Sequence, residues 1–330
     1  MTDDVDPSRV AAAFALDQPV GAPVRIQERG PVLAWRIDTG AGPVLIKRFW
    51  AETDLPWRDQ LEQAMRIEQL AVAAGIDSPP PITPRDPLFG SVAGIEGLGL
   101  FRAFRFIEHR PLRDSDDIAE WVGTTLARTH RLIPLESPPE PNYWYGQHPP
   151  VPPEQWGRWV ESGTARGNSW ADALRENHDL VVDLAARVTS TFATATPHVI
   201  SHRDFEPWNV LVPLDGAPPM LIDWDTAGPE SAPLEAAFAF ARFGPRGRED
   251  PDPAWVRRAH AAYVAAGGPP LTGGPGILDR MVGSELAAIA AGIGDFFDMG
   301  VPDDRTRDLL ERLPATVARI RRWEGIFAQL

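Results

Sequence analysis

Short apolar runs, separated by turns rich in glycine and polar residues, dominate the first third of the chain. Runs of this length that contain β-branched and aromatic residues predict strands. They lie at 24–30, 32–38, 43–50, 88–94 and 98–108. A short helix is expected at 8–18, and residues 57–75 show the apolar spacing of a longer one, which Gly75 ends. The pattern predicts an N-terminal region that is mostly sheet.

The rest of the chain is patterned mainly for helices. Helical spacing covers 116–132 and about 170–193, and three or four further helices follow the segment "MLIDWDTAG". Residues 134–170 are rich in proline and aromatic residues and predict loops with short helices. We expect an α+β protein with two lobes, a sheet lobe at 1–107 and a larger helical lobe at 108–330.

Composition narrows the possible partners. The chain has 330 residues, 43% of them hydrophobic, which is enough for a large core, and it has no cysteine for a disulfide or a thiolate metal site. Its net charge of −14 suits metal ions and cationic small molecules better than nucleic acid or anionic membrane, although on charge alone solubility is the favoured explanation. We expect no protein partner, and no leader or membrane-spanning run is evident, so a cytoplasmic location is expected.

Lysine is nearly absent from this sequence. Of the 32 basic residues, Lys47 is the one lysine and the other 31 are arginines. Lysine is a compact point charge, whereas arginine is a wide planar fork, so Lys47 is a candidate for a site that needs the smaller cation. Side chains alternate along a strand, which puts Lys47 on the same face as Leu45 and Phe49 and favours a cleft over open solvent. A single leftover surface lysine is the alternative.

Three oxygen-bearing side chains follow short apolar runs in the second half of the chain. In "VISHRDFEPWNVLVP", Asp204 lies in a loop between two apolar runs, and Asn209 follows five residues later. A third run, "PMLID", ends at Asp223, fourteen residues after Asn209. Carboxylate and amide oxygens are ligands that Mg²⁺ accepts, and Mg²⁺ needs only one or two such ligands when substrate phosphates supply the others.

These residues together indicate phosphoryl transfer. That reaction needs a cation at the nucleotide phosphates, oxygens that hold Mg²⁺, and a carboxylate beside the attacking hydroxyl. A glycosidase explanation of the paired carboxylates leaves Asn209 and Lys47 without a role. The glycine-containing stretches at 94–99 and 273–276 lack the order of a dinucleotide or Walker-type phosphate loop.

The segment "SHRDFEPWNVLV", followed by "LIDWD", resembles the catalytic segment of the aminoglycoside phosphotransferase family. Weaker matches extend from "VLAWRIDTGAGPVLIKRF" through "AGIDSPPPI" and "LARTHRL" to "AGPESAPLEAAF". This family shares the protein-kinase-like fold with choline kinases. The resemblance implies a small antiparallel-sheet N-lobe that binds the nucleotide and a larger, mainly helical C-lobe that holds the catalytic loop and the acceptor pocket.

The resemblance also implies roles for individual residues. Asp204 corresponds to the catalytic aspartate that accepts or orients the substrate hydroxyl, and Asn209 and Asp223 correspond to the Mg²⁺ ligands. Lys47 corresponds to the strand lysine that binds the α- and β-phosphates, with Leu45 beside it at the nucleotide.

In the family, a helix carboxylate pairs with the strand lysine. Glu68 is the first choice here and Glu62 the second; six residues apart, they point roughly 240° from one another around a helix, so both cannot face one cleft. Residues 104–110 resemble the hinge, with Phe106 and Glu108 near the adenine.

The chain departs from the protein-kinase pattern in two places. The first two strands are not joined by a Gly-x-Gly-x-x-Gly loop, and "IDWD" stands in place of Asp-Phe-Gly. Both departures disfavour a protein substrate. The resemblance therefore implies a Mg²⁺-dependent kinase that uses ATP or GTP to phosphorylate a hydroxyl of a small, possibly cationic molecule such as an antibiotic or similar natural product. A metabolic kinase of an amino alcohol or sugar and a nucleotide-binding pseudokinase are the alternatives.

Several further side chains have open roles. An aromatic cluster lies where the resemblance places the acceptor pocket, and core packing is the favoured explanation for most of its members. They are Tyr143, Trp144, Tyr145, Trp156, Trp159 and Trp170. Structural roles are expected for His130, His202, Trp208 and Glu235. Asp225 faces either substrate or water.

Overall fold

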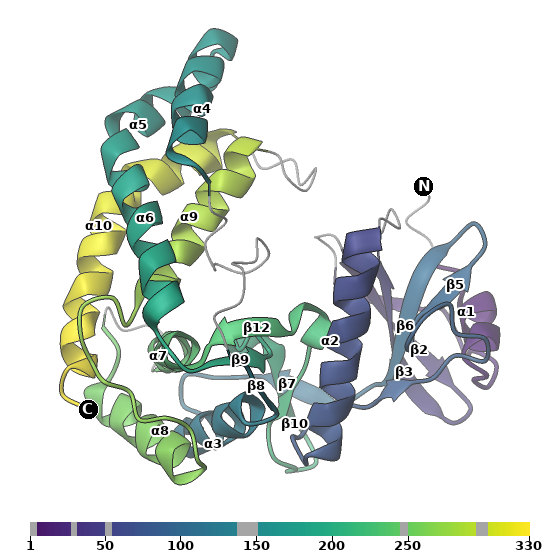
Figure 1. Ribbon diagram of the computed structural model, residues 1–330. Coiled ribbons are helices and arrows are strands. Elements are labelled where there is room, and N and C mark those ends of the chain that lie inside the picture. Colours follow the sequence, from purple (N-terminus) through teal and green to yellow (C-terminus); the bar gives the residue numbers. More distant parts are fainter. Residues whose placement is uncertain (1–4, 28–31, 50–54, 137–150, 245–249, 295–302) are drawn as a thin grey trace. The chain divides into compact units, whose positions relative to one another are not determined.

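The computed structural model describes residues 5–27, 32–49, 55–136, 151–244, 250–294 and 303–330 (Figure 1). The chain divides into two compact units. The first contains Met1–Leu112 and Trp208–Ala227, and the second contains Arg113–Pro207 and Gly228–Leu330. This division differs from the expected lobes, 1–107 and 108–330, because the segment with Asn209 and Asp223 belongs to the N-terminal unit.

An antiparallel sheet forms the body of the first unit. Its order is β1-β2-β3-β6-β4, and β5 pairs with β6 beside that path. The strands are β1 (Val24–Gln27), β2 (Val32–Thr39), β3 (Gly42–Phe49), β4 (Pro81–Ile82), β5 (Ala93–Ile95) and β6 (Gly99–Arg105). The predicted small antiparallel sheet is confirmed, although β1, β5 and β6 are shorter than the apolar runs that indicated them.

One helix covers each face of this sheet (Figure 1). Val44 and Ile46 of β3 belong to the core cluster on the side of α1 (Pro7–Ala13), whereas Phe49 packs in the cluster that includes Leu61 and Met65 of α2 (Leu55–Ala73). The predicted alternation along β3 is therefore confirmed. Helix α1 is shorter than expected.

A second small sheet explains why the segment 208–227 lies in the first unit. It has the order β11-β10-β7, with β7 (His109–Pro111), β10 (Val210–Pro213) and β11 (Met220–Leu221). Strand β10 pairs antiparallel with β7, which begins within the predicted hinge. Asn209 immediately precedes β10, and Asp223 follows β11 by two residues, so this sheet positions both predicted metal ligands.

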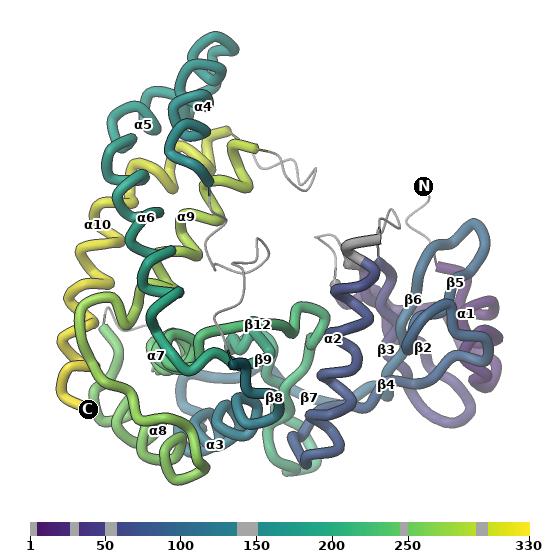
Figure 2. Tube along the Cα trace, viewed as in Figure 1, coloured from purple at the N-terminus to yellow at the C-terminus, as the bar shows by residue number. Residues whose placement is uncertain are grey.

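Helices make up most of the second unit. They are α3 (Ala119–His130), α4 (Pro153–Arg166), α5 (Ala171–Glu176), α6 (His178–Thr194), α7 (Ala232–Phe243), α8 (Pro253–Ala265), α9 (Asp279–Gly294) and α10 (Asp303–Phe327). Helices α6, α9 and α10 lie side by side, as do α3 and α8 (Figures 1 and 2). The single helix predicted at 170–193 is two helices, which meet at Asn177.

A three-stranded antiparallel sheet leads into the loop of Asp204. Its order is β12-β9-β8, with β8 (Ile133–Pro134), β9 (His198–Ser201) and β12 (Gly228–Ser231). Strand β9 is buried along its whole length and ends at Ser201, so the loop begins from a fixed point in the core. Within the described part of the chain, no helix is both long and apolar enough to cross a membrane.

Candidate active site

The loop that carries Asp204 runs between β9 and β10, with its first six residues in the second unit. His202, Arg203, Phe205 and Glu206 are buried, whereas Asp204 is partly exposed. The Asp204 backbone N–H donates to His202 Nδ1 at 3.3 Å, so His202 braces the loop as expected. Trp208 does not pack as expected, because it is 61% exposed.

Two buried side chains fix the backbone of the residue before Asp204. Arg203 has a φ of +69°, in the left-handed region that is unfavourable for a residue with a Cβ. Its backbone N–H donates to Glu235 Oε1 at 2.9 Å, and its carbonyl oxygen accepts from the Arg280 guanidinium. Both backbone polar groups of Arg203 are therefore bonded to charged side chains, which hold this residue in the conformation that presents Asp204.

Glu235 is itself held by a buried histidine. His130 Nε2 lies 2.8 Å from Glu235 Oε2, and His130 Nδ1 lies 2.7 Å from the Tyr263 hydroxyl. Burial acts to raise the pKa of Glu235, but the hydrogen bond and charge of His130 outweigh it and lower the pKa to about 2. Glu235 is therefore ionised, and it and His130 have the structural roles expected for them.

Glu206 lies two residues after Asp204 and has a different environment. Arg242 Nε of α7 donates to Glu206 Oε2 at 2.9 Å. Burial nevertheless raises the pKa of Glu206 to about 7, against the charge of Arg242, and the nearby charge of Asp204 adds to the rise. The loop thus contains a carboxyl group that titrates near neutral pH.

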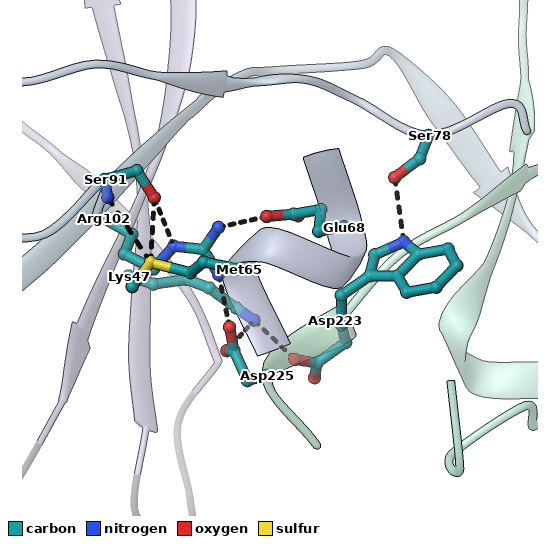
Figure 3. Close-up of polar contacts among 9 residues, drawn as sticks. Lys47, Met65, Glu68, Ser78, Ser91, Arg102, Asp223 and Asp225 are labelled. Carbon is teal, nitrogen blue, oxygen red and sulfur yellow. Dashed lines mark hydrogen bonds and ion pairs between the residues drawn. The ribbon is translucent and has the colours of Figure 1, made fainter. Parts of the chain in front are cut away.

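Lys47 meets carboxylates of the segment 208–227 inside the first unit (Figure 3). Its ammonium donates to Asp223 Oδ1 at 2.7 Å and to Asp225 Oδ2 at 2.9 Å. Lys47 is only 9% exposed, and burial acts to lower its pKa, but the charges of the two aspartates raise the pKa above its ordinary value. Lys47 is therefore a buried cation in a polar site, and Asp225 faces this lysine instead of substrate or water.

Backbone contacts hold Asp223 next to the start of β10. Asp223 has a φ of +68°, and the Ile222 N–H donates to the Asn209 carbonyl oxygen at 2.9 Å. The following Trp224 is buried and donates through its indole N–H to Ser78 Oγ at 3.1 Å. The predicted ligands Asn209 and Asp223 thus lie on connected segments, Asn209 buried and the Asp223 side chain 38% exposed.

Hard oxygen atoms and partial exposure suit Asp223 to hold Mg²⁺, with Asn209 from the adjoining segment as a second ligand. Among the residues that the structure describes, no group of three or more His, Asp or Glu side chains is arranged to hold a metal ion. The expected site needs only these two protein ligands and stays a prediction.

The expected pair between Glu68 and Lys47 is corrected by the structure. Glu68 is 2% exposed on α2 and forms its ion pair with Arg102 of β6. Glu62 lies on another side of α2 and pairs with Arg66 at 2.9 Å. Neither glutamate of α2 therefore forms the predicted ion pair with Lys47, whose partners are Asp223 and Asp225. Arg102, a charged residue within an apolar run, was the signal in the sequence that could have indicated this.

The predicted hinge joins β6 to β7 and is partly exposed. The Phe106 N–H donates to the Pro43 carbonyl oxygen at 3.0 Å, and the Glu108 carbonyl oxygen accepts from the Leu214 N–H at 2.9 Å. The Glu108 side chain accepts from Arg36 at 2.7 Å. Leu45 is partly buried on β3. The roles of Leu45, Phe106 and Glu108 at the nucleotide stay predictions.

The aromatic cluster is only partly within the described residues, since Tyr143, Trp144 and Tyr145 lie outside them. Trp156 and Trp159 are buried on α4, with ring centroids 4.9 Å apart in an edge-to-face arrangement. Trp170 is buried too, next to Gly163 of α4, where a Cβ would lie 2.4 Å from its ring. These three side chains pack within the helical unit, as the packing explanation predicts.

An antiparallel-sheet unit and a mainly helical unit are the two parts of the protein-kinase-like fold. The chain belongs to the phosphotransferase enzyme family, whose model matches residues 32–269. The predicted family and fold are confirmed, and the protein is a phosphotransferase.

Solved structures of this fold include both antibiotic and metabolic kinases. The aminoglycoside phosphotransferase of Alicyclobacillus acidocaldarius subsp. acidocaldarius is 14% identical, with a TM-score of 0.61 over 100% of this chain and 97% of that one. Spectinomycin phosphotransferase, solved with ADP and spectinomycin, is 14% identical, with a TM-score of 0.64 over 96% of each chain. Plasmodium vivax ethanolamine kinase is 14% identical, with a TM-score of 0.60 over 92% of this chain and 85% of that one. No curated protein matches this sequence.

Proposed function

We propose that the protein transfers the γ-phosphoryl group of ATP or GTP, with Mg²⁺, to a hydroxyl group of a small molecule. The observation that carries this proposal is the ion pair between Lys47 and Asp223. These residues are 176 positions apart in the sequence, yet the lysine Nζ lies 2.7 Å from the Asp223 carboxylate. A cation for phosphates beside a carboxylate for a metal is the arrangement that binding of a metal-nucleotide complex requires.

The side chains have distinct tasks in this reaction. Lys47 binds the α- and β-phosphates, and Asn209 and Asp223 hold Mg²⁺, which when bound neutralises charge on the phosphate oxygens. Asp204 accepts the proton of the acceptor hydroxyl as the hydroxyl oxygen bonds to the γ-phosphorus and the bond to the β-phosphate oxygen breaks. Because the neighbours of Asp204 are buried and bonded, its carboxylate is positioned before the acceptor arrives.

The acceptor is a small hydroxylated molecule, with an antibiotic or similar natural product as the first candidate. The net charge of −14 favours a cationic acceptor. An amino alcohol or sugar is the second candidate, because the ethanolamine kinase resembles this chain in fold as much as the antibiotic kinases do. We place the reaction in the cytoplasm, where nucleotide and Mg²⁺ are available.

A screen of acceptors tests this proposal. Purified protein is incubated with MgATP or MgGTP and with hydroxylated antibiotics, amino alcohols and sugars, and nucleoside diphosphate release and a phosphorylated product are measured. Asp204→Asn should lower turnover about 10²–10⁴-fold while nucleotide binding is retained. Asp183→Asn, an exposed position on α6, is the matched control and should keep wild-type turnover.

Two results would contradict the proposal. Turnover by Asp204→Asn equal to that of the wild type would remove the assigned base. Tight nucleotide binding without transfer to any acceptor would favour the pseudokinase. Resistance of a host that expresses the protein, tested against the antibiotics that are phosphorylated, separates the antibiotic kinase from the metabolic one.

A further inference from the structure

Two buried cations lie directly opposite one another in the sheet of the first unit. Lys47 of β3 and Arg102 of β6 are cross-strand partners, and Arg102 is only 1% exposed. Like charges directly opposite on neighbouring strands destabilise a sheet, and buried charges need partners. The arrangement is therefore stable only if carboxylates lie between or beside the two cations.

Asp225 provides the shared carboxylate. Its Oδ2 accepts from Lys47 at 2.9 Å and its Oδ1 accepts from the Arg102 guanidinium (Figure 3). Asp225 thus connects the two cations and fixes the direction in which the lysine ammonium points.

The remaining donors of Arg102 are directed at α2 and its neighbours. One guanidinium nitrogen donates to Glu68 of α2, and Nε donates to Ser91 Oγ at 3.1 Å. Ser91 Oγ in turn donates to Met65 Sδ of α2 at 3.2 Å. The planar guanidinium reaches all these acceptors at once, which a lysine in its place would not do.

We propose that Asp225 orients Lys47 toward the nucleotide phosphates and that Arg102 is a positioning residue that connects Glu68 on α2 to Asp225. This inference rests on the proposed function, which assigns Lys47 to the nucleotide. It explains why Glu68 is buried although it forms no ion pair with Lys47. It also separates two tasks, since Asp225 holds the lysine while Asp223 is left to hold Mg²⁺.

The proposal makes the effect of Glu68 depend on Arg102. If Glu68 acts on the lysine through Arg102 alone, removal of Glu68 matters in the wild type and has no further effect once Arg102 is replaced. If Glu68 instead reaches Lys47 directly when nucleotide binds, its removal weakens binding in either background. Such non-additivity is what a double-mutant cycle measures.

Binding of MgADP by calorimetry tests these relationships without a known acceptor. Charge-assisted hydrogen bonds contribute enough that Asp225→Asn and Arg102→Gln are each expected to weaken binding about tenfold. Arg102→Lys should bind MgADP as weakly as Arg102→Gln does, because one lysine ammonium cannot reach all the acceptors of the planar guanidinium. Glu68→Gln should weaken MgADP binding when it is made in the wild type. When it is added to Arg102→Gln, it should change MgADP affinity by less than about twofold. The controls are Arg66→Gln and Asp59→Asn, on the exposed side of α2, which should bind as the wild type does.

A second readout uses the single lysine of the chain. Protein labelled selectively at lysine gives one side-chain NMR signal, that of Lys47. Glu68→Gln should move this signal in the wild type and leave it in place in Arg102→Gln, whereas both control variants should leave it unchanged. A variant that only lowers the stability of the protein, without a change around Lys47, would not move the NMR signal of Lys47. The signal therefore separates an effect on the position of the lysine from a general effect on packing.

The outcomes are distinct. Wild-type MgADP affinity in Asp225→Asn, or equal effects of Glu68→Gln in both backgrounds, overturns the inference while the proposed function stands. Failure of the wild type to bind MgADP and MgATP overturns both. If Asp225→Asn or Arg102→Gln does not fold, Asp225→Glu and Arg102→Lys, which keep the buried charge, decide: weakened binding supports the inference, and wild-type affinity overturns it.

Discussion

The Glu235 carboxylate accepts a hydrogen bond of 2.9 Å from the backbone N–H of Arg203, the residue directly before Asp204. Arg203 lies in the left-handed region, so this bond offsets part of the cost of an unfavourable backbone conformation. Because Glu235 is held in turn by His130, the position of Asp204 depends on buried polar side chains of α3 and α7.

Replacement of Glu235 should therefore affect both stability and turnover. Glu235→Ala leaves the Arg203 N–H and His130 without their partner and should lower the free energy of unfolding by about 1–3 kcal/mol or more. Glu235→Gln keeps an acceptor for the Arg203 N–H and should cost less. Denaturant unfolding compares the two, and an alanine variant as stable as the glutamine variant would show that this hydrogen bond does not matter.

The raised pKa of Glu206 predicts a specific pH dependence of stability. Burial raises this pKa from 4.5 to about 7, so between these values the folded protein keeps a proton that the unfolded chain has lost. The resulting stabilisation is complete below pH 4.5 and is lost as the pH rises through 7. It amounts to about 3 kcal/mol at most.

Unfolding at pH 5 and pH 8 checks this dependence. The free energy of unfolding of the wild type, compared with that of Glu206→Gln, should be lower at pH 8 than at pH 5. Glu161→Gln, at an exposed position of α4, should show no such change relative to the wild type. If the difference in free energy of unfolding between the wild type and Glu206→Gln is the same at pH 5 and pH 8, the pKa of Glu206 is not raised.

Lys47→Arg tests whether the site needs the smaller cation. The ammonium lies between Asp223 Oδ1 and Asp225 Oδ2, opposite the Arg102 guanidinium. A second wide guanidinium in this position should displace the carboxylates and weaken MgADP binding about tenfold, although the charge is kept. If Lys47→Arg binds MgADP with wild-type affinity in titration calorimetry, the site does not need the smaller cation.

Gly123 allows the close approach of α3 and α8. A Cβ at this position would lie 2.1 Å from the Ala259 carbonyl oxygen and 2.8 Å from the Tyr263 nitrogen. Gly123→Ala should therefore destabilise the helical unit by about 1–3 kcal/mol or more. At Gly157 of α4 the nearest atom would be 3.9 Å away, so Gly157→Ala should be neutral or stabilising by about 0.5–1 kcal/mol. Equal melting temperatures of Gly123→Ala and Gly157→Ala would contradict the close approach of α3 and α8 at Gly123.

Much of the first unit could be predicted because strands alternate in a regular way. The order of apolar and polar residues in 43–50 put Lys47 on the side of Phe49, and that arrangement is found. The order of Asp204, Asn209 and Asp223 between short apolar runs indicated their chemistry. Trp208 was predicted wrongly, because hydrophobicity alone does not tell which way a loop side chain points.

The sequence by itself therefore determined the family, the antiparallel sheet with its helix, and the identity of the candidate site residues, because these depend on local periodicity and on a short motif. The tertiary structure alone decided that β10 joins β7, which brings Asn209 and Asp223 into the unit of Lys47. It alone decided that Glu68 pairs with Arg102 and that Asp225 holds Lys47. Strand register and the depth of a helix arise from packing between distant segments, and no local pattern records which buried charges will meet.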